Sequence, residues 1–258
     1  MRRIGALIVG ASLLAACSGK TRPPEPLFET RVTERRAGPC GADGQVDCAG
    51  ARIEYPACVA APVDEICERI NRTVAEWVLR PLDGGAPFDA PDAVIERFLE
   101  DHGAERQRAP DGRHTWSMER TVRVSFQGPQ AISLSALESG FTGGPHPFSS
   151  LTYLTFRPAT GERLTLSEIL VENGRHGLDA AGEIYFRQAR ELAAGAVLAD
   201  EGFRFPGGRF TLPENFAFNR VGLQFHFNVD DIAPYPLGET GLTIPQGEAL
   251  PWLRPEFQ

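Results

Sequence analysis

The sequence predicts an α+β fold with a mostly antiparallel sheet and helices packed on one side. Segments of strand-like alternation occur in runs: strands come first, then two helical segments, a run of strands, two further helices and a final set of strands. A strict alternation of strands and helices would instead predict a parallel sheet. The hydrophobic fraction of 42% is sufficient for one compact core of moderate size.

The first part of the chain predicts two strands and a helix. Residues 28–34 and 52–55 alternate apolar and polar side chains, and we expect the second strand to end at Pro56. Residues 62–80 carry apolar side chains at helical spacing, which predicts the clearest helix of the chain.

A second helix is expected over residues 91–102, with Gly103 as its end, because glycine is the usual residue just past a helix terminus. Further on, Thr165 and Glu168 form a capping-box pattern that opens a short helix. Another helix is predicted over 178–192.

Further strands are predicted at 121–126, 132–135 and 151–156. A hairpin is expected around Asn219-Arg220. In its second strand, alternation places His226 on the polar face, where histidines are commonly solvated.

The N-terminus has the pattern of a bacterial lipoprotein signal. Arg2 and Arg3 precede an apolar run over 4–14, which is too short to span a bilayer and ends in Leu14-Ala15-Ala16-Cys17. We therefore expect a signal peptide at 1–16, a diacylglycerol on the thiol of Cys17, and a membrane anchor through that lipid. Ser18 stands where an inner-membrane retention signal would have Asp, so we expect an outer-membrane location facing the periplasm.

The remaining chain is expected to form a tether and a folded region. Residues 17–27 are polar and proline-rich, which suits a lipidated tether. Residues 28–258 are expected to fold, with a possible subdivision near 28–130 and 131–258.

The charge favours a basic partner. The formal net charge is −8, and removing Arg2 and Arg3 with the signal peptide lowers it to −10. This charge argues against nucleic acid and anionic lipid head groups as partners.

The four other cysteines are Cys40, Cys48, Cys58 and Cys67. Their even number and close spacing in an exported chain predict two disulfides, for which three connectivities are possible. We favour the local pairs Cys40–Cys48 and Cys58–Cys67. A four-cysteine zinc site is the less favoured alternative, because the spacing has no C-x-x-C pair and the compartment is oxidising.

Two stretches of the chain resemble a known family. The first is Ser139-Gly140-Phe141-Thr142-Gly143-Gly144-Pro145-His146-Pro147, and the second includes Ile232-Ala233-Pro234-Tyr235-Pro236-Leu237-Gly238. They resemble the RsiV-like extracytoplasmic domain, which occurs in a lysozyme-sensing anti-sigma factor, beside peptidoglycan deacetylase domains, and alone in envelope lipoproteins of unknown function. The resemblance implies a lysozyme-like protein or peptidoglycan as the partner.

Five residues in these stretches are candidates for binding: Gly143, Gly144, His146, Asp231 and Tyr235. A stiff glycine–proline loop that presents one imidazole can hold a ligand, but such a histidine can equally bond to its own turn. The sequence has neither the Gly-x-Ser-x-Gly nor the His-Glu-x-x-His motif. We predict no catalytic residue, metal or cofactor.

The expected function is therefore a non-catalytic binding module of the cell envelope. One alternative is an envelope hydrolase that uses His146 with a nearby Ser or Asp. Another is a structural lipoprotein of an envelope assembly, which a large exposed apolar patch would indicate.

Overall fold

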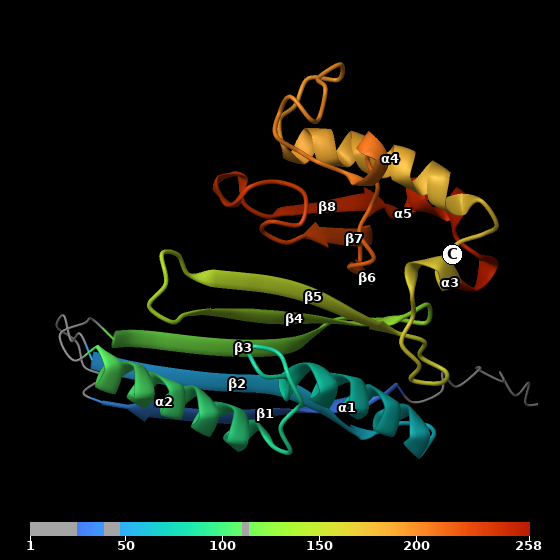
Figure 1. Cartoon of the computed structure of the whole chain (residues 1–258). Coiled ribbons are helices and arrows are strands. Elements are labelled where there is room, and N and C mark those ends of the chain that lie inside the picture. Colours follow the sequence, from blue (N-terminus) through green and yellow to red (C-terminus); the bar gives the residue numbers. More distant parts are fainter. Residues whose placement is uncertain (1–24, 39–46, 110–113) are drawn as a thin grey trace, which may run out of the picture.

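The computed structural model describes residues 25–38, 47–109 and 114–258, which form four layers (Figure 1). The helices α1 (Asp64–Val78) and α2 (Pro91–Arg108) cover one face of a five-stranded sheet. A three-stranded sheet lies on the other side of that sheet, and α4 (Gly174–Ala189) covers the outer face of the second sheet. The predicted α+β class is confirmed.

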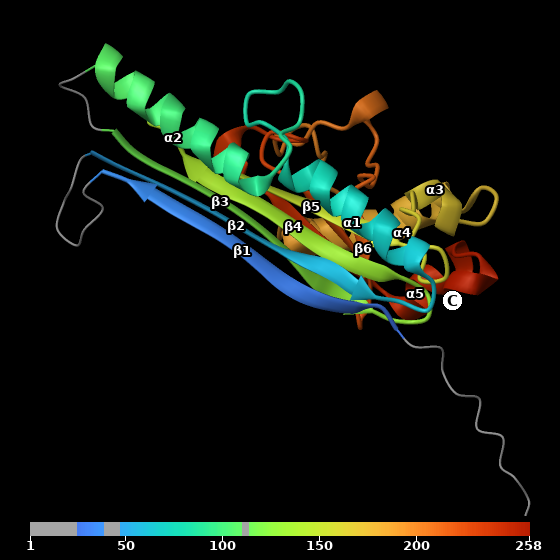
Figure 2. The same ribbon diagram turned by 90° about the horizontal axis from the view of Figure 1, so that it is seen from below.

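The first sheet is mixed rather than wholly antiparallel. Its order is β1-β2-β3-β4-β5, and only the β2–β3 pair is parallel. Parallel neighbours need a long crossover connection, and here that connection carries α1 and α2. Figure 2 shows the two helices following one another along the strands, with β1 at the free edge. The strands are β1 (Leu27–Ala37), β2 (Asp47–Ala60), β3 (His114–Gln127), β4 (Ile132–Phe141) and β5 (Phe148–Phe156).

The second sheet is antiparallel and contains the predicted hairpin. Its strands are β6 (Phe216–Phe218), β7 (Gly222–Phe227) and β8 (Thr240–Pro245). Two short helices flank it in sequence, α3 (Leu166–Ile169) and α5 (Gln246–Ala249). The predicted capping box at the start of α3 is present, with Thr165 N donating to Glu168 over 2.7 Å.

Two hydrophobic cores fill the spaces between these layers. The first packs α1 and α2 onto the five-stranded sheet, with Ile53, Ile70 and Ile95 fully buried. The second packs α4 onto the three-stranded sheet, and Phe186 lies at its centre with phenylalanine rings around it. The domain boundaries stay a prediction.

The predicted end of the second strand at Pro56 is wrong. Strand β2 continues to Ala60, and Pro56 pairs with Thr30 of β1. The parallel pairing of β2 with β3 stops at Glu54. Beyond that residue, β2 has no strand partner on its β3 side, so the N–H group that Pro56 lacks is not needed there. Proline is tolerated at such a position.

The predicted helix end at Gly103 is also wrong, since α2 continues to Arg108. A glycine inside a helix costs about 1 kcal/mol relative to alanine. Ion pairs along the last turns offset that cost: Arg106 bonds Asp47 of β2 over 2.6 Å, and Arg108 bonds Glu105 over 2.9 Å.

A disulfide fastens the end of β2 to the start of α1. Cys58 and Cys67 are bonded, with their Cα atoms 5.0 Å apart, which confirms this predicted pair. The side chain of Asn71 strengthens the junction, because it accepts from Cys58 N and donates to Cys58 O. Cys48 is also disulfide-bonded, whereas Cys17 and Cys40 lie outside the described residues. Disulfides of this kind are typical of oxidising compartments.

A buried arginine joins β3, β4 and the end of α1. The side chain of Arg120 is fully buried, and its Nη1 donates to the carbonyls of Val78 and Arg80 over 2.6 Å each. Its Nε donates to Glu138 of β4 over 2.6 Å, and Arg80 donates to the other oxygen of Glu138. Val78 is the last residue of α1 and Arg80 lies just beyond it, so neither carbonyl has a partner within the helix. The guanidinium therefore caps α1 while neutralising Glu138.

The pKa of Glu138 reflects this pair. Burial alone would raise the pKa, but attraction and hydrogen bonds from Arg120 and Arg80 hold it below its usual value. The carboxylate therefore stays charged in the folded protein at neutral pH.

We predict that Arg120→Met lowers the free energy of unfolding by about 3 kcal/mol or more, because it leaves Glu138 buried without its main partner. Chemical denaturation measures this change. Arg123→Met is the matched control, since Arg123 lies on the same strand with its side chain 70% exposed. Equal stability of the two variants would contradict this role of Arg120.

Candidate functional site

The turn between β4 and β5 contains the first stretch that resembles the known family. Gly143 has a φ of +82°, which favours glycine. A Cβ atom there would also lie 3.3 Å from the indole nitrogen of Trp116, so the turn packs closely against β3. Gly144 has neither constraint, and a Cβ atom there would meet open space.

The turn brings His146 against Tyr235 of the second stretch. The two rings stack with their centroids 4.5 Å apart and their planes at 20°. The Tyr235 hydroxyl donates to Pro147 O over 3.4 Å, which fixes the tyrosine on the same turn. His146 is exposed and Tyr235 is 39% exposed, so both rings remain accessible. The structure therefore joins two of the predicted binding residues, although 88 residues separate them along the chain.

The loop between β7 and β8 holds Tyr235 in place. Asp231 accepts from Asn228 N over 2.7 Å, and its own N–H donates back to Asn228 O. The chain then forms a 3-10 turn at Tyr235–Leu237, and Arg190 of α4 donates to the Leu237 carbonyl over 2.7 Å. The carboxylate of Asp231 thus shapes the loop that carries Tyr235.

Two asparagines anchor this loop and β6 to the edge of β5. Asn215 accepts from Tyr153 N and donates to Leu151 O, each over 2.7 Å. Asn228 accepts from Leu151 N, also over 2.7 Å. Strand β5 is the last strand of its sheet, so these side chains satisfy edge groups that a neighbouring strand would otherwise bind.

The prediction that His226 is solvated on a polar face is wrong. His226 is only 6% exposed, because the polar face of β7 packs against the five-stranded sheet. The imidazole lies edge-on to Tyr153, and its Nε2 is 3.5 Å from a carboxylate oxygen of Glu239. Burial lowers the pKa of His226 even though Glu239 acts to raise it. Burial, with a smaller contribution from Glu239, raises the pKa of Tyr153 to about 12.

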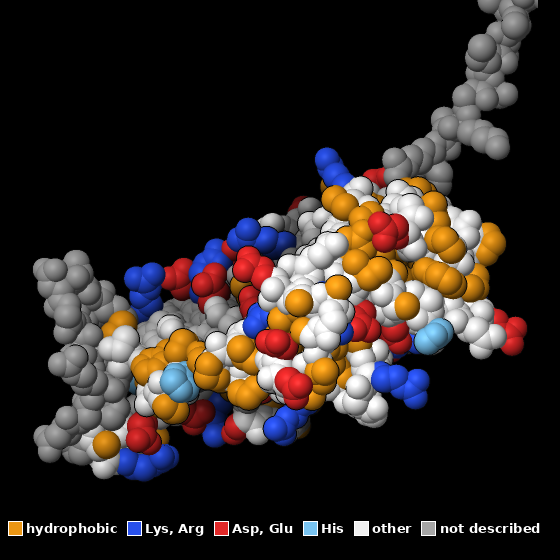
Figure 3. Space-filling model, turned by 90° about the horizontal axis from the view of Figure 1, so that it is seen from above, with side chains coloured by type: hydrophobic (Ala, Val, Ile, Leu, Met, Phe, Trp, Pro, Cys, Tyr) orange, Lys and Arg blue, Asp and Glu red, His pale blue; other side chains and the backbone are white. Residues whose placement is uncertain are grey.

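The end of the molecule that carries His146 and Tyr235, here called the tip, has acidic side chains nearby. The surface around it carries charged and apolar side chains. Asp230 and Asp231 are exposed beside the loop that holds Tyr235, and the Glu239 side chain is 52% exposed. Seen from the side of α4, acidic and basic side chains are interspersed, and apolar side chains gather in two areas (Figure 3). One of these areas lies at the end of the molecule where the β4–β5 turn is found.

The site has little of the geometry that catalysis requires. Across the described ranges, His146 makes no hydrogen bond or ion pair with a serine or a carboxylate; its contact is the ring of Tyr235. A nucleophile and its base need such a bond. Within the same ranges, no group of three or more His, Cys, Asp or Glu side chains is placed to hold a metal ion.

A comparison with protein families finds a match to the second half of the chain. Residues 167–247 match the model of a family described as a protein of unknown function, DUF3298. This segment of the chain is similar to the DUF3298 family. The predicted resemblance to the RsiV-like domain is therefore confirmed, and the matched segment contains Asp231 and Tyr235 but not His146. A comparison with curated proteins finds no match.

Two solved structures of DUF3298 proteins share the fold. One is from Bacteroides fragilis, with 18% sequence identity and a TM-score of 0.70, covering 91% of this chain and 96% of that one. The other is from Pseudomonas aeruginosa, with 18% identity, a TM-score of 0.63 and the same coverage of both chains. The likeness extends over both sheets, well beyond the matched segment.

We predict that Asn215→Ala destabilises the fold by about 2 kcal/mol, because it leaves Tyr153 N without its acceptor and removes one of the two side-chain donors to Leu151 O in a half-buried seam. Thermal or chemical unfolding measures this loss. Ser149→Ala, an exposed change on the same strand, is expected to have little effect. An Asn215→Ala variant as stable as the parent would show that water satisfies the edge of β5 equally well.

His226 is expected to make stability depend on pH. Its pKa is lower in the folded chain than the value of about 6.5 expected in the unfolded chain, so the unfolded state binds the proton more readily. The free energy of unfolding should therefore fall as pH drops through 6.5 towards the folded pKa. Denaturant titrations from pH 8 to pH 5 should show a shallower dependence for His226→Gln. The same slope in both proteins would contradict the assignment.

Proposed function

We propose that this protein is a lipid-anchored envelope protein that binds a basic, lysozyme-like protein through the stacked pair His146–Tyr235. The single observation that supports this role is the pair itself. Its two rings come from the two stretches that resemble the RsiV-like domain, and they meet at an exposed tip. A tip of this form fits into a concave partner such as an enzyme cleft.

The physical chemistry of the pair suits an interface. Tyrosine gives a large contact area at small entropic cost, and aromatic residues at the centre of an interface commonly contribute most of the binding energy. Stacking on His146 and the bond to Pro147 fix the orientation of Tyr235 before binding. A preorganised side chain loses less conformational freedom on association.

Charge supports a basic partner. The formal charge is −8, or −10 without the signal peptide, and three carboxylates border the loop that carries Tyr235: Asp230, Asp231 and Glu239. Opposite charge speeds the encounter of two proteins, and this effect weakens with salt.

The N-terminal pattern and the structure fit an anchored domain. Leu14-Ala15-Ala16-Cys17 supplies the proposed lipid site, Ser18 favours the outer membrane, and the Cys58–Cys67 disulfide suits the oxidising periplasm that the domain would face. None of the described helices is both long and apolar enough to span a bilayer. The lipid on Cys17 is therefore the proposed attachment.

Calorimetry with the anchor-free chain, residues 21–258, tests the proposal, since this chain contains both hydrophobic cores. We expect binding to hen-type lysozyme that weakens with rising salt. Tyr235→Ala should weaken it roughly thirtyfold, the effect of losing about 2 kcal/mol at an interface hot spot. His146→Ala should weaken it less, because its role is to orient the tyrosine.

The matched control is His176→Ala, an exposed histidine on α4. It should bind as the parent does. Peptidoglycan fragments form the second arm of the experiment. Binding to the fragments alone would assign a glycan partner in place of the protein, and binding to neither would overturn the proposed function.

A further inference from the structure

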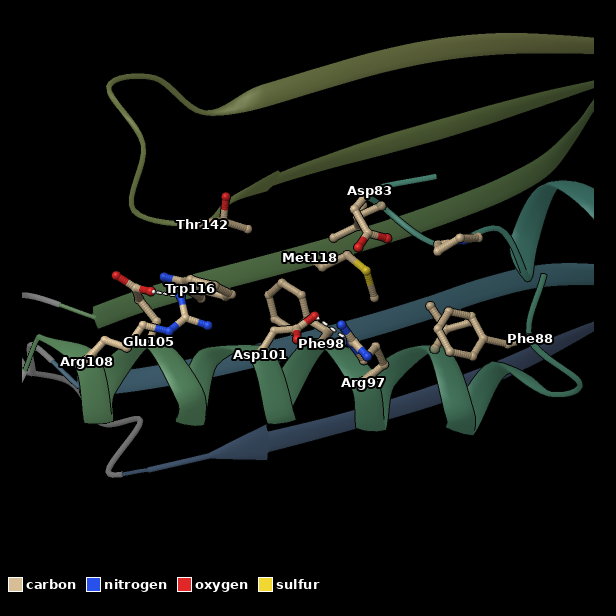
Figure 4. Close-up of a pocket in the computed structure, with 13 residues that line it drawn as sticks. Asp83, Phe88, Arg97, Phe98, Asp101, Glu105, Arg108, Trp116, Met118 and Thr142 are labelled. Atoms are coloured by element: carbon tan, nitrogen blue, oxygen red, sulfur yellow. Dashed lines mark hydrogen bonds and ion pairs between the residues drawn. The ribbon is translucent and has the colours of Figure 1, made fainter. Parts of the chain in front are cut away.

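A pocket lies on the helix side of the first sheet and reaches the start of the β4–β5 turn, where Thr142 lines it. It has a volume of about 310 Å³ and is enclosed by α2, the connection that follows α1, and the first half of β3 (Figure 4). This size is at the lower end of the range of small-molecule sites, roughly 300–1,000 Å³. The pocket is therefore large enough for a small organic ligand.

The floor of the pocket is apolar and largely aromatic. Phe98 of α2 and Met118 of β3 are buried, while Phe88 and Trp116 are half-buried at the two ends. The rings of Phe98 and Trp116 lie 5.8 Å apart with their planes at 51°. Leu82 stands at the lip with 42% of its surface exposed. Aromatic rings thus line a cavity that is open to solvent.

The rim of the pocket carries more negative than positive charge. Both guanidiniums are already bonded to carboxylates of α2: Arg97 to Asp101 and Arg108 to Glu105, each over 2.9 Å. Asp83 is the third carboxylate of the rim, and no residue in the described ranges forms a salt bridge with it. Asp83 and Met118 both line the pocket, and the side chain of Asp83 is exposed (Figure 4). The rim therefore offers a carboxylate to a bound cation.

A carboxylate above aromatic rings is a combination that recognises organic ammonium groups. The ring faces attract the cation, the carboxylate neutralises it, and the apolar floor takes the rest of the ligand. An organic anion would be repelled by the excess of carboxylates at the rim. The charge of the rim thus selects one class of ligand.

We propose that this pocket binds a small amphipathic ammonium compound, with its apolar body on Phe88, Phe98 and Trp116 and its cationic group at Asp83. Neither His146 nor Tyr235 lines this pocket, so the proposal does not rest on the proposed function. It also contains its own reporter, because the indole of Trp116 forms part of the pocket wall.

Benzyltrimethylammonium is a suitable probe, with phenylacetate and benzyl alcohol as the anionic and neutral comparisons. The anchor-free chain is used because detergent would compete for the apolar floor. Calorimetry measures affinity, and the indole N–H resonances of Trp77, Trp116 and Trp252 locate the site. We expect saturable binding of the cation, the weakest binding for phenylacetate, and a shift of the Trp116 resonance larger than the other two.

Two exposed aspartates of the same connection form a matched pair of variants. Asp83→Asn should weaken cation binding about fivefold, as the loss of a solvent-exposed ion pair does. Asp89→Asn should leave it unchanged, because Asp89 does not line the pocket.

Three results would overturn the proposal. The first is no saturable binding of the cation, and the second is equal binding of the neutral compound and the cation. The third is a cation affinity that Asp83→Asn leaves unchanged. Each result is independent of lysozyme binding, so failure here and failure of the proposed function are distinguishable.

Discussion

The buried guanidinium of Arg120 is the constraint on which the first half of the structure depends. A charge withdrawn from water is tolerated only when its partners are in place, and here they come from three elements. The end of α1 supplies two carbonyls, β4 supplies Glu138, and β3 supplies the arginine itself. These bonds hold the end of α1 at one position on the sheet, and the crossover between the parallel strands is fixed with it.

A second constraint joins the two sheets through polar side chains. Ser133 accepts from Phe218 N, and Thr155 donates to Phe216 O, so β6 lies against β4 and β5 with matched hydrogen bonds. Asn215 and Asn228 extend this seam along the edge of β5. An exposed strand edge invites pairing with another chain, and side-chain amides here occupy part of that edge. The same bonds place the β7–β8 loop next to the β4–β5 turn, which allows Tyr235 to reach His146.

Strand alternation and helical spacing predicted most elements and the fold class. They did not predict the burial of polar side chains, which depends on what covers each face of a sheet. His226 follows the polar alternation of β7, and only the second layer shows that this face is covered. Arg120 has the same parity as Val122, and Glu138 the same parity as Leu134, so a complete reading of the alternation would have placed both on the buried face. Their ion pair could not be predicted from the sequence, because the partner of each lies on another element.

The candidate site was only partly predictable for a similar reason. The resemblance identified both stretches, yet the stacking of His146 on Tyr235 arises from the docking of one sheet on another. The apolar pocket was not foreseen at all. Phe98 and Met118 follow ordinary core patterns, and the opening appears only because the connection after α1 leaves part of the α2–β3 interface uncovered.

The strand register also has a mechanical consequence. Ala37 pairs with Ala49, Ala49 with Trp116, and Ser117 with Phe141, so β1 runs towards the β4–β5 turn and begins at the opposite end of the sheet. A pull between the N-terminal side of Leu27 and a partner held at the tip would act along the strands. All the hydrogen bonds between β1 and β2 would then share the load in shear instead of opening one after another. The first sheet therefore resists extension best along the direction of its strands.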